Sequence, residues 1–171
     1  MATATMVSVS EYLASSFRPD RELVDGHLEE RNGGEYDHSN LQTALASWLR
    51  VRRQTWNIRV LVEQRIKVAT GRYRIPDICV ISRDQAIEPV FSKPPMICIE
   101  VLSKDDTLRS MQDRVDDYTA FGVANIWIID PVKRRAHICT NHDFCEPTGG
   151  VLEVANSPIL IPLDELFADP G

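Results

Sequence analysis

The chain has 171 residues, of which 43% are apolar and 26% are charged, and its formal net charge is −6. This size and composition are those of a globular protein with a sizeable core, so we expect residues 1–171 to form a single domain. The negative charge argues against a protein that coats nucleic acid, but a nuclease with metal-binding carboxylates is also negative until its metal binds. No apolar stretch approaches the roughly 18 residues of a membrane helix, and Met1–Met6 lacks the basic region of a signal peptide, so we expect a cytoplasmic protein without a membrane partner.

The first elements predicted along the chain are a short helix and a hairpin. Val9 to Phe17 has apolar residues at helical spacing, and Ser8 or Ser10 can cap the helix that this spacing predicts. Residues 22–29 predict a β-hairpin, because the pair Asp25-Gly26 readily adopts the positive φ angles of a tight turn.

The strongest helix prediction covers Tyr36 to Arg53, and Asp37 or Ser39 can cap its start. An apolar stripe marks the face of this helix that we expect to pack on the core. The stripe consists of Leu41, Leu45, Trp48 and Leu49. Ile58 to Val68 then alternates in a way that predicts one long strand.

Two apolar strands follow, and the first of them contains a proline. Tyr73 to Ser82 predicts a strand in which Pro76 lies either at a sheet edge or at a bend, because proline cannot donate to a ladder. Met96 to Leu102 predicts a buried strand.

The last third of the chain predicts a helix and further strands. The helix covers about Asp106 to Phe121, with Ser103 and Asp106 at the spacing of a capping box and Gly122 as its C-terminal stop. The remaining predicted elements are strands at Asn125–Ile129 and Arg134–Thr140, and a short strand or turn with a helical turn at Ile159–Phe167. The order predicts a mixed α+β fold, in which helices pack on the faces of a mixed β-sheet.

Each of the two apolar strands carries one acidic residue: Asp77 in the first and Glu100 in the second. A carboxylate inside a buried strand is costly unless a cation meets it. Two carboxylates on consecutive strands can meet the same cation, and Mg²⁺ is a hard ion that takes one or two carboxylates together with water and phosphate. The alternative is that Asp77 and Glu100 are satisfied separately and have structural roles.

Several strings of this sequence resemble the Uma-type restriction endonuclease family of the PD-(D/E)XK nuclease superfamily. The central ones are Ile75-Pro76-Asp77 and Glu100-Val101-Leu102-Ser103. The others lie in the same order along the chain, at residues 22–28, 37–39, 62–64, 117–123 and 126–131.

The resemblance implies a restriction-endonuclease-like fold, with a mixed β-sheet flanked by helices and an N-terminal helix and hairpin. It also implies hydrolysis of DNA phosphodiester bonds that depends on Mg²⁺, with Mn²⁺ as a substitute. Asp77 and Glu100 match the two acidic metal ligands of the superfamily. Two active sites acting on two strands would suit a homodimer.

The sequence departs from the superfamily pattern at the catalytic lysine, because Leu102 stands two residues after Glu100. In Uma-type relatives a lysine precedes the helical tyrosine by four residues, and here Tyr118 is preceded at that spacing by Arg114. An arginine can hold a phosphate or orient water, but it does not readily lose a proton. Lys104 is another candidate for the missing ammonium group, and a surface salt bridge is the structural interpretation of Arg114.

Three further positions are weaker candidates for the site. Only one of Glu63 and Gln64 can face the site if strand alternation holds, and the resemblance favours Gln64. His38 resembles a family position but also suits a structural or capping role. Glu30 is a remote candidate from the N-terminal region.

The sequence leaves three hypotheses for the function. The first is a Mg²⁺-dependent endonuclease, the second is a catalytically impaired relative that binds nucleic acid or a protein partner, and the third is a structural α/β module without metal. A structural zinc site is disfavoured, because the spacing of the late cysteines and histidines matches no common zinc motif. These residues are His137, Cys139, His142 and Cys145.

Overall fold

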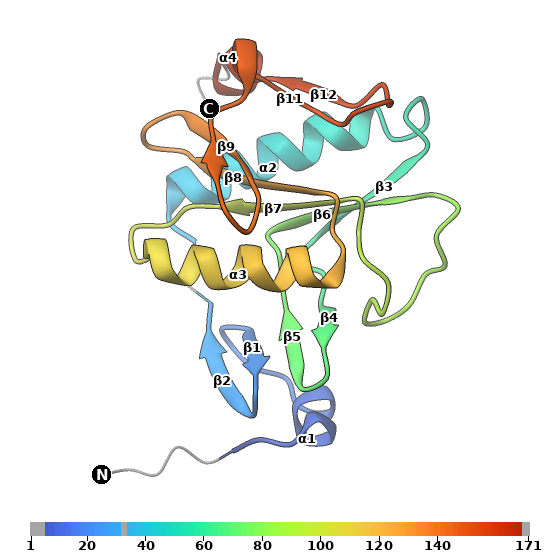
Figure 1. The fold of residues 1–171 in the computed structure, drawn as a ribbon, viewed down its shortest axis with the longest axis vertical. Helices are drawn as coiled ribbons and strands as arrows, with labels where there is room; N and C mark the ends of the chain where they lie inside the picture. The colour runs from blue at the N-terminus through green and yellow to red at the C-terminus, as the bar shows by residue number, and fades with distance from the viewer. Residues whose placement is uncertain (1–5, 32–33, 169–171) are drawn as a thin grey trace.

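The computed structural model describes residues 6–31 and 34–168 (Figure 1). The expectation about a signal peptide concerns a segment that lies almost entirely outside these residues. Within the described part of the chain, the longest and most apolar helices still fall short of what crossing a membrane requires.

A small four-stranded sheet forms one end of the molecule, next to helix α1 (Val9–Ala14) (Figure 1). Its strand order is β2-β1-β5-β4. The predicted hairpin is confirmed, because Asp25 and Gly26 have φ angles of 51° and 86°. The strands are β1 (Arg21–Val24), β2 (His27–Glu30), β4 (Ile66–Ala69) and β5 (Arg72–Arg74).

The main sheet has six strands in the order β10-β9-β8-β7-β6-β3. It is a mixed sheet, since β7 and β8 are parallel and the other neighbours are antiparallel. Its strands are β3 (Ile58–Val62), β6 (Ile78–Ser82), β7 (Ile97–Val101), β8 (Asn125–Asp130), β9 (Arg135–Cys139) and β10 (Phe144–Cys145).

Two long helices cover opposite faces of the main sheet, and strand alternation decides which residues each one meets. Helix α2 (Tyr36–Val51) packs on the face that contains Ile78 and Val80, whereas α3 (Leu108–Phe121) packs on the face that contains Cys79 and Ile81. The α2 side is extended by a C-terminal unit consisting of η1 (Thr148–Gly150), β11 (Val151–Glu153), β12 (Leu160–Pro162) and α4 (Leu163–Ala168). The predicted arrangement of a mixed sheet flanked by helices is therefore confirmed.

Two predicted strands are each divided between the two sheets. The strand predicted over Ile58–Val68 breaks at Glu63, whose φ of 53° turns the chain from β3 into β4. The strand predicted over Tyr73–Ser82 breaks at residues 75–77, between β5 and β6. Pro76 thus marks the passage from the small sheet to the main sheet, and Asp77 lies directly at the start of β6.

The predicted caps at Ser8 of α1 and at Gly122 of α3 are confirmed, whereas those at the starts of α2 and α3 differ from the observed ones. Helix α3 begins at Leu108, and its capping box joins Thr107 to Ser110, whereas Ser103 and Asp106 form a separate turn just before it. Glu35 is the N-cap of α2 and makes no side-chain cap hydrogen bond, so neither Asp37 nor Ser39 caps this helix. Both differences reflect competition among several polar residues near each helix start.

Candidate active site

Asp77 is held by partners from three separate segments and is only 4% exposed. Its Oδ2 accepts a hydrogen bond of 2.8 Å from the backbone N–H of Val101 and lies 3.2 Å from Nε2 of His38. Its Oδ1 accepts a bond of 2.6 Å from Arg31. These contacts fix the orientation of the Asp77 carboxylate at the start of β6.

Glu100 lies on β7 and is equally buried, with 4% of its surface exposed. The hydroxyl of Tyr118 on α3 donates a hydrogen bond to its Oε1, and Nη1 of Arg114 lies 3.6 Å from its Oε2. Burial is the main cause that raises the pKa of Glu100 to about 7, and the neighbouring Asp77 adds to the rise. The groups around Glu100 therefore offset only part of the cost of burying its negative charge.

The two predicted carboxylates come together at one cavity. Strands β6 and β7 pair with Ile78 opposite Ile99, which places Asp77 next to Glu100 at the end of the ladder. The cavity has a volume of about 20 Å³, enough for one small bound species such as a water molecule. Its walls are formed by Arg31, His38, Asp77, Glu100, Val101, Ser103, Asp106 and Arg114.

Arg114 reaches this cavity from α3, as the helical spacing predicts. Its Nη1 donates a hydrogen bond of 2.9 Å to Glu22, which is fully buried on β1. Burial opposes the charge of Arg114, but Glu100 and Glu22 outweigh burial and raise its pKa further above its ordinary range. Arg114 is thus a permanent cation between two carboxylates, not the surface residue of the structural interpretation, and it cannot act as a proton donor or base.

A buried network of charges continues from Glu22 away from the cavity. Arg74 donates hydrogen bonds of 2.8 Å to Glu22 and 2.8 Å to Glu29, and its Nε donates one of 2.7 Å to Asp117 on α3. Glu22 also accepts a 2.7 Å bond from the backbone N–H of Ile75. This network fastens the small sheet to α3 and so fixes the wall from which Arg114 extends.

The structure does not bring three of the sequence-predicted residues to the cavity, namely Glu30, Gln64 and Lys104. Glu30 pairs with Arg21 at 2.5 Å. The amide of Gln64 donates to the carbonyl oxygens of Arg65 and Pro89, at 3.0 Å each. The positive φ of Glu63 breaks the strand alternation, and it is the carboxylate of Glu63 that lies 3.4 Å from Arg31 beside the site. Lys104 is exposed and pairs with Glu35, at a neighbouring hollow instead of the carboxylate cavity.

Arg31 is the site residue that sequence reasoning missed, and Glu22 was recognised only as part of a family string. His38, whose two interpretations were left open, does contact Asp77, and this hydrogen bond is the main cause that raises its pKa. A lone arginine after a strand carries no local signal, because its partner lies 46 positions later in the chain. Glu22 could have been recognised from the sequence, because it is an acidic residue at a position of the predicted hairpin strand that is expected to be buried.

The oxygen donors at the cavity fit a hard divalent ion, and the space of about 20 Å³ takes the ion itself, so that its waters would lie on the side open to solvent. No three histidine, cysteine or acidic side chains lie together as a metal-binding group within residues 6–31 and 34–168. Mg²⁺ does not need such a group, since one or two carboxylates with waters suffice. Asp77 and Glu100 supply these carboxylates, although the ion must compete with Arg31 for Oδ1 of Asp77.

Comparisons with known proteins bear on the family and the fold. The model of the Uma2 family, described as "Putative restriction endonuclease", matches residues 9–159. A crystal structure from Anabaena variabilis, described as "a putative nuclease belonging to DUF820", superposes with a TM-score of 0.79 at 19% identity, covering 95% of this chain and 98% of that chain. This likeness confirms the restriction-endonuclease-like fold.

A second solved structure, the DrdV–DNA complex, has a TM-score of 0.45 at 19% identity and covers 66% of this chain and 10% of that chain. That score is too low to support a fold assignment. No match is found among curated proteins.

Proposed function

The chain belongs to the Uma2 family, and on that premise we propose that it is an endonuclease that depends on Mg²⁺ and hydrolyses DNA phosphodiester bonds through a metal-activated water. The observation that carries the proposal is the convergence of Asp77 and Glu100 on one small cavity. Each carboxylate has partners of its own, but both face the same cavity, where one ion would meet both.

Asp77 and Glu100 are the residues that would hold the ion. When bound, Mg²⁺ supplies positive charge to the phosphate and lowers the pKa of its bound water. The backbone N–H of Val101 and the hydroxyl of Tyr118 hold the two carboxylates in fixed orientations, so that little reorganisation is needed on binding.

The two arginines at the cavity are suited to phosphate oxygens. Arg31 and Arg114 both line the cavity, and guanidinium groups bind phosphate with directional, charge-assisted hydrogen bonds. Arg114 therefore stands in the place of the superfamily lysine as a charge-stabilising and orienting group. We further propose a homodimer, in which two such sites address the two strands of DNA.

Nicking of supercoiled plasmid tests the proposal. The wild-type chain is compared in Mg²⁺, in Mn²⁺ and in EDTA with the isosteric variants Asp77→Asn and Glu100→Gln. Glu153→Ala, which changes an exposed acid on β11, is the matched control. Thermal melting of every variant shows whether the fold is retained.

We expect nicking by the wild type and by Glu153→Ala with either metal, and only background nicking by the other two variants. Nicking that survives in both Asp77→Asn and Glu100→Gln would place the activity elsewhere or in a contaminant. A folded wild type that cuts nothing in either metal would favour the second candidate.

That second candidate is a relative that binds nucleic acid or a partner without cutting it. One contact and one substitution favour it: Arg31 occupies Oδ1 of Asp77 at 2.6 Å, and Arg114 cannot exchange a proton as lysine can. The candidate predicts DNA binding by a chain that shows no metal-dependent cleavage.

A further inference from the structure

The arginine-rich stretch at residues 50–74 is divided by the structure into a neutralised part and an unpaired part. The later arginines each pair with at least one carboxylate, and they are Arg65, Arg72 and Arg74. The earlier ones form no ion pair among the residues that the structure describes, and they are Arg50, Arg52, Arg53 and Arg59. Only the earlier arginines therefore keep their charge free for a partner outside the chain.

These unpaired arginines lie at one end of the main sheet, where α2 ends and β3 begins. Arg53 donates a hydrogen bond of 2.8 Å to the carbonyl oxygen of Arg50. Arg59 on β3 donates to the carbonyl oxygen of Arg83, a further unpaired arginine, whose N–H bonds the carbonyl oxygen of Asn57 at 3.0 Å. Both turns lie at the right of Figure 1, and the start of α2 lies at the left. We call Arg50, Arg52, Arg53, Arg59 and Arg83 the arginine surface.

Two of these side chains also have a structural role at the end of α2. Arg52 and Arg53 each donate to a carbonyl oxygen of the last helical turn, where basic side chains are favoured. The guanidinium group of Arg52 lies over the rings of Trp48 and Trp56, 3.7 Å and 5.7 Å from their centroids. A guanidinium group has five N–H donors, and each of these hydrogen bonds uses Nη1 alone. The other donors remain available to a ligand.

The arginine surface is positive although the chain as a whole is negative. Two acids border it: Asp84 bonds Asn57, and Glu165 lines a hollow together with Arg52, but neither acid forms an ion pair with these arginines. Five positive charges thus lie beside two negative ones, in a chain whose net charge is −6. Like charges three positions apart on a helix repel each other, and an external anion would relieve this repulsion.

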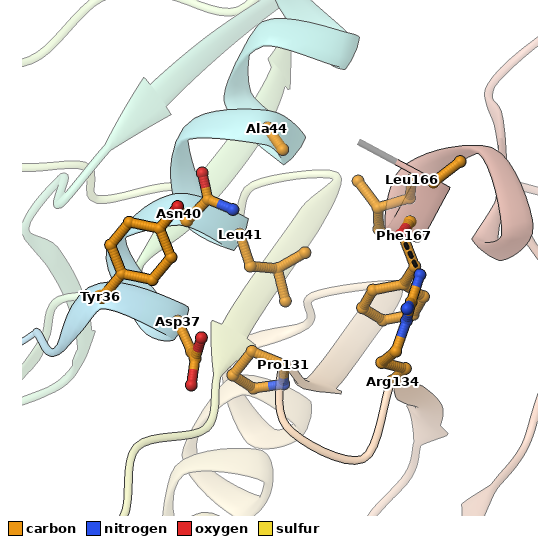
Figure 2. Close-up of a pocket in the computed structure, with 10 residues that line it drawn as sticks. Tyr36, Asp37, Asn40, Leu41, Ala44, Pro131, Arg134, Leu166 and Phe167 are labelled. Atoms are coloured by element: carbon orange, nitrogen blue, oxygen red, sulfur yellow. Dashed lines mark hydrogen bonds between the residues drawn. The ribbon is translucent and has the colours of Figure 1, made fainter. Parts of the chain in front are cut away.

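The first turns of α2 have the opposite character. Glu35 and Asp37 are exposed there, and Figure 2 shows Asp37 and Asn40 beside a hollow of about 360 Å³. Arg134, on the other side of this hollow, is already engaged, because it donates a hydrogen bond to the carbonyl oxygen of Phe167. A polyanion would therefore be repelled at the start of α2 and attracted at its end.

We propose that the arginine surface binds the phosphate backbone of duplex DNA outside the carboxylate cavity. A duplex presents one phosphate charge per about 1.7 Å of its axis, twice the density of either strand alone. The two tryptophan rings are partly buried and lie under Arg52, so they offer little surface on which an unpaired base could stack. A duplex is therefore the nucleic acid that fits this surface better than a single strand.

The surface lies at a defined distance from the carboxylate cavity. Helix α2 rises about 21 Å between His38, which lines that cavity, and Arg52. This length corresponds to about six phosphates along one strand of a duplex. The inference goes beyond the proposed nuclease function and does not rest on it, because a chain that binds DNA without cutting it would use the same surface.

Fluorescence anisotropy in EDTA tests the surface without cleavage. The full chain is titrated against a labelled DNA duplex of about two helical turns, a single strand of the same length and labelled poly-glutamate. The variants are Arg50→Gln and Arg83→Gln, whose side chains have no hydrogen bond or ion pair within the described residues, and Arg50→Lys, which keeps the charge. The control is Arg18→Gln, which removes an equal charge from an exposed, unpaired arginine after α1.

We expect the duplex to bind more tightly than the single strand. Arg50→Gln and Arg83→Gln should each reduce the slope of log affinity against log salt concentration by about 0.9, the value for one phosphate contact of a duplex. The same loss weakens binding about eightfold at a salt concentration of about 0.1 M. Arg50→Lys and Arg18→Gln should keep the slope and the affinity of the wild type.

An unchanged slope in both Arg50→Gln and Arg83→Gln overturns the proposal, as does an equal loss in Arg18→Gln, which would trace the effect to net charge. The absence of duplex binding or a preference for the single strand also overturns it. Poly-glutamate that binds as tightly as the duplex would assign the surface to an acidic protein instead.

The result is separable from the nuclease test. Plasmid nicking by a chain whose duplex affinity is unchanged in Arg50→Gln and Arg83→Gln would refute only the arginine surface. Duplex binding that depends on these arginines, without nicking in either metal, would refute only the nuclease.

Discussion

The protein contains two adjoining clusters of buried charge that differ in one respect. Around Glu22, Arg74 and Asp117, each carboxylate receives short hydrogen bonds from arginine, and the cluster stands between the small sheet and α3. Around Asp77 and Glu100 the same types of residue surround a cavity, and the pKa of Glu100 is raised to about 7 by its burial.

The difference shows which buried carboxylates have a structural role and which can bind a ligand. A buried charge that is fully paired holds elements together, and removal of its partner is costly. Glu100 lies beside an open space with its arginine 3.6 Å away and so retains capacity for a cation, whereas Asp77 already has Arg31 at 2.6 Å. Arg114 pairs with Glu22 in the first cluster and lies near Glu100 in the second. The structural cluster therefore holds Arg114 in place at the cavity.

The largest effect should come from the structural cluster. Glu22→Gln removes the fully buried carboxylate that Arg74 and Arg114 share, although Arg74 keeps Glu29 and Asp117. We expect a loss of about 3 kcal/mol in the free energy of unfolding, the lower end for a broken buried ion pair. For a chain of this size the loss corresponds to a fall in Tm of roughly 10 °C. Glu100→Gln should melt close to the wild type, since an amide keeps the hydrogen bond from Tyr118. Equal melting temperatures for these two variants in calorimetry would erase the distinction between the clusters.

Arg114→Lys tests the residue that the clusters share. A lysine can lose a proton and can orient water as a compact ammonium group, so the nicking rate should rise, by up to about 100-fold if proton transfer limits the wild type. The measurement is the initial rate of plasmid nicking in Mg²⁺. An unchanged or lower rate in a folded variant would indicate that arginine is suited to this position.

Arg31→Gln tests the competition at Asp77. Removal of the guanidinium group from Oδ1 should raise the affinity for Mn²⁺ by about tenfold, or about 1.4 kcal/mol. Calorimetric titration measures this affinity without any need for cleavage. The control is Arg21→Gln, which removes an equal charge from an exposed pair with Glu30. The account of Arg31 is wrong if both variants bind Mn²⁺ like the wild type.

The smallest effect should come from that same exposed pair. Arg21→Gln should change the free energy of unfolding by less than about 1 kcal/mol, because surface ion pairs contribute little. Urea denaturation provides the measurement. A loss as large as that of Glu22→Gln would mean that burial is not what separates structural from incidental charge pairs here.

Local patterns predicted most of the elements and the burial of two carboxylates that line one cavity. Helical spacing found α2 and α3, the Asp25-Gly26 turn found the hairpin, and the interrupted apolar runs found Asp77 and Glu100. Arg31 escaped because its partnership with Asp77 is formed only when the small sheet docks on the main one. Gln64 was preferred over Glu63 on the family resemblance, and the alternation that let only one of them face the site ends at Glu63, whose φ is positive. Such long-range docking and single-residue breaks are not visible in periodicity.

The central claim is that Asp77 and Glu100 together bind one divalent ion. Isothermal titration calorimetry of Mn²⁺ into the wild type, Asp77→Asn and Glu100→Gln tests it most directly. The account predicts one ion for each wild-type chain and no binding by either folded variant. A folded wild type that binds no ion, or binding that persists in both variants, would contradict it.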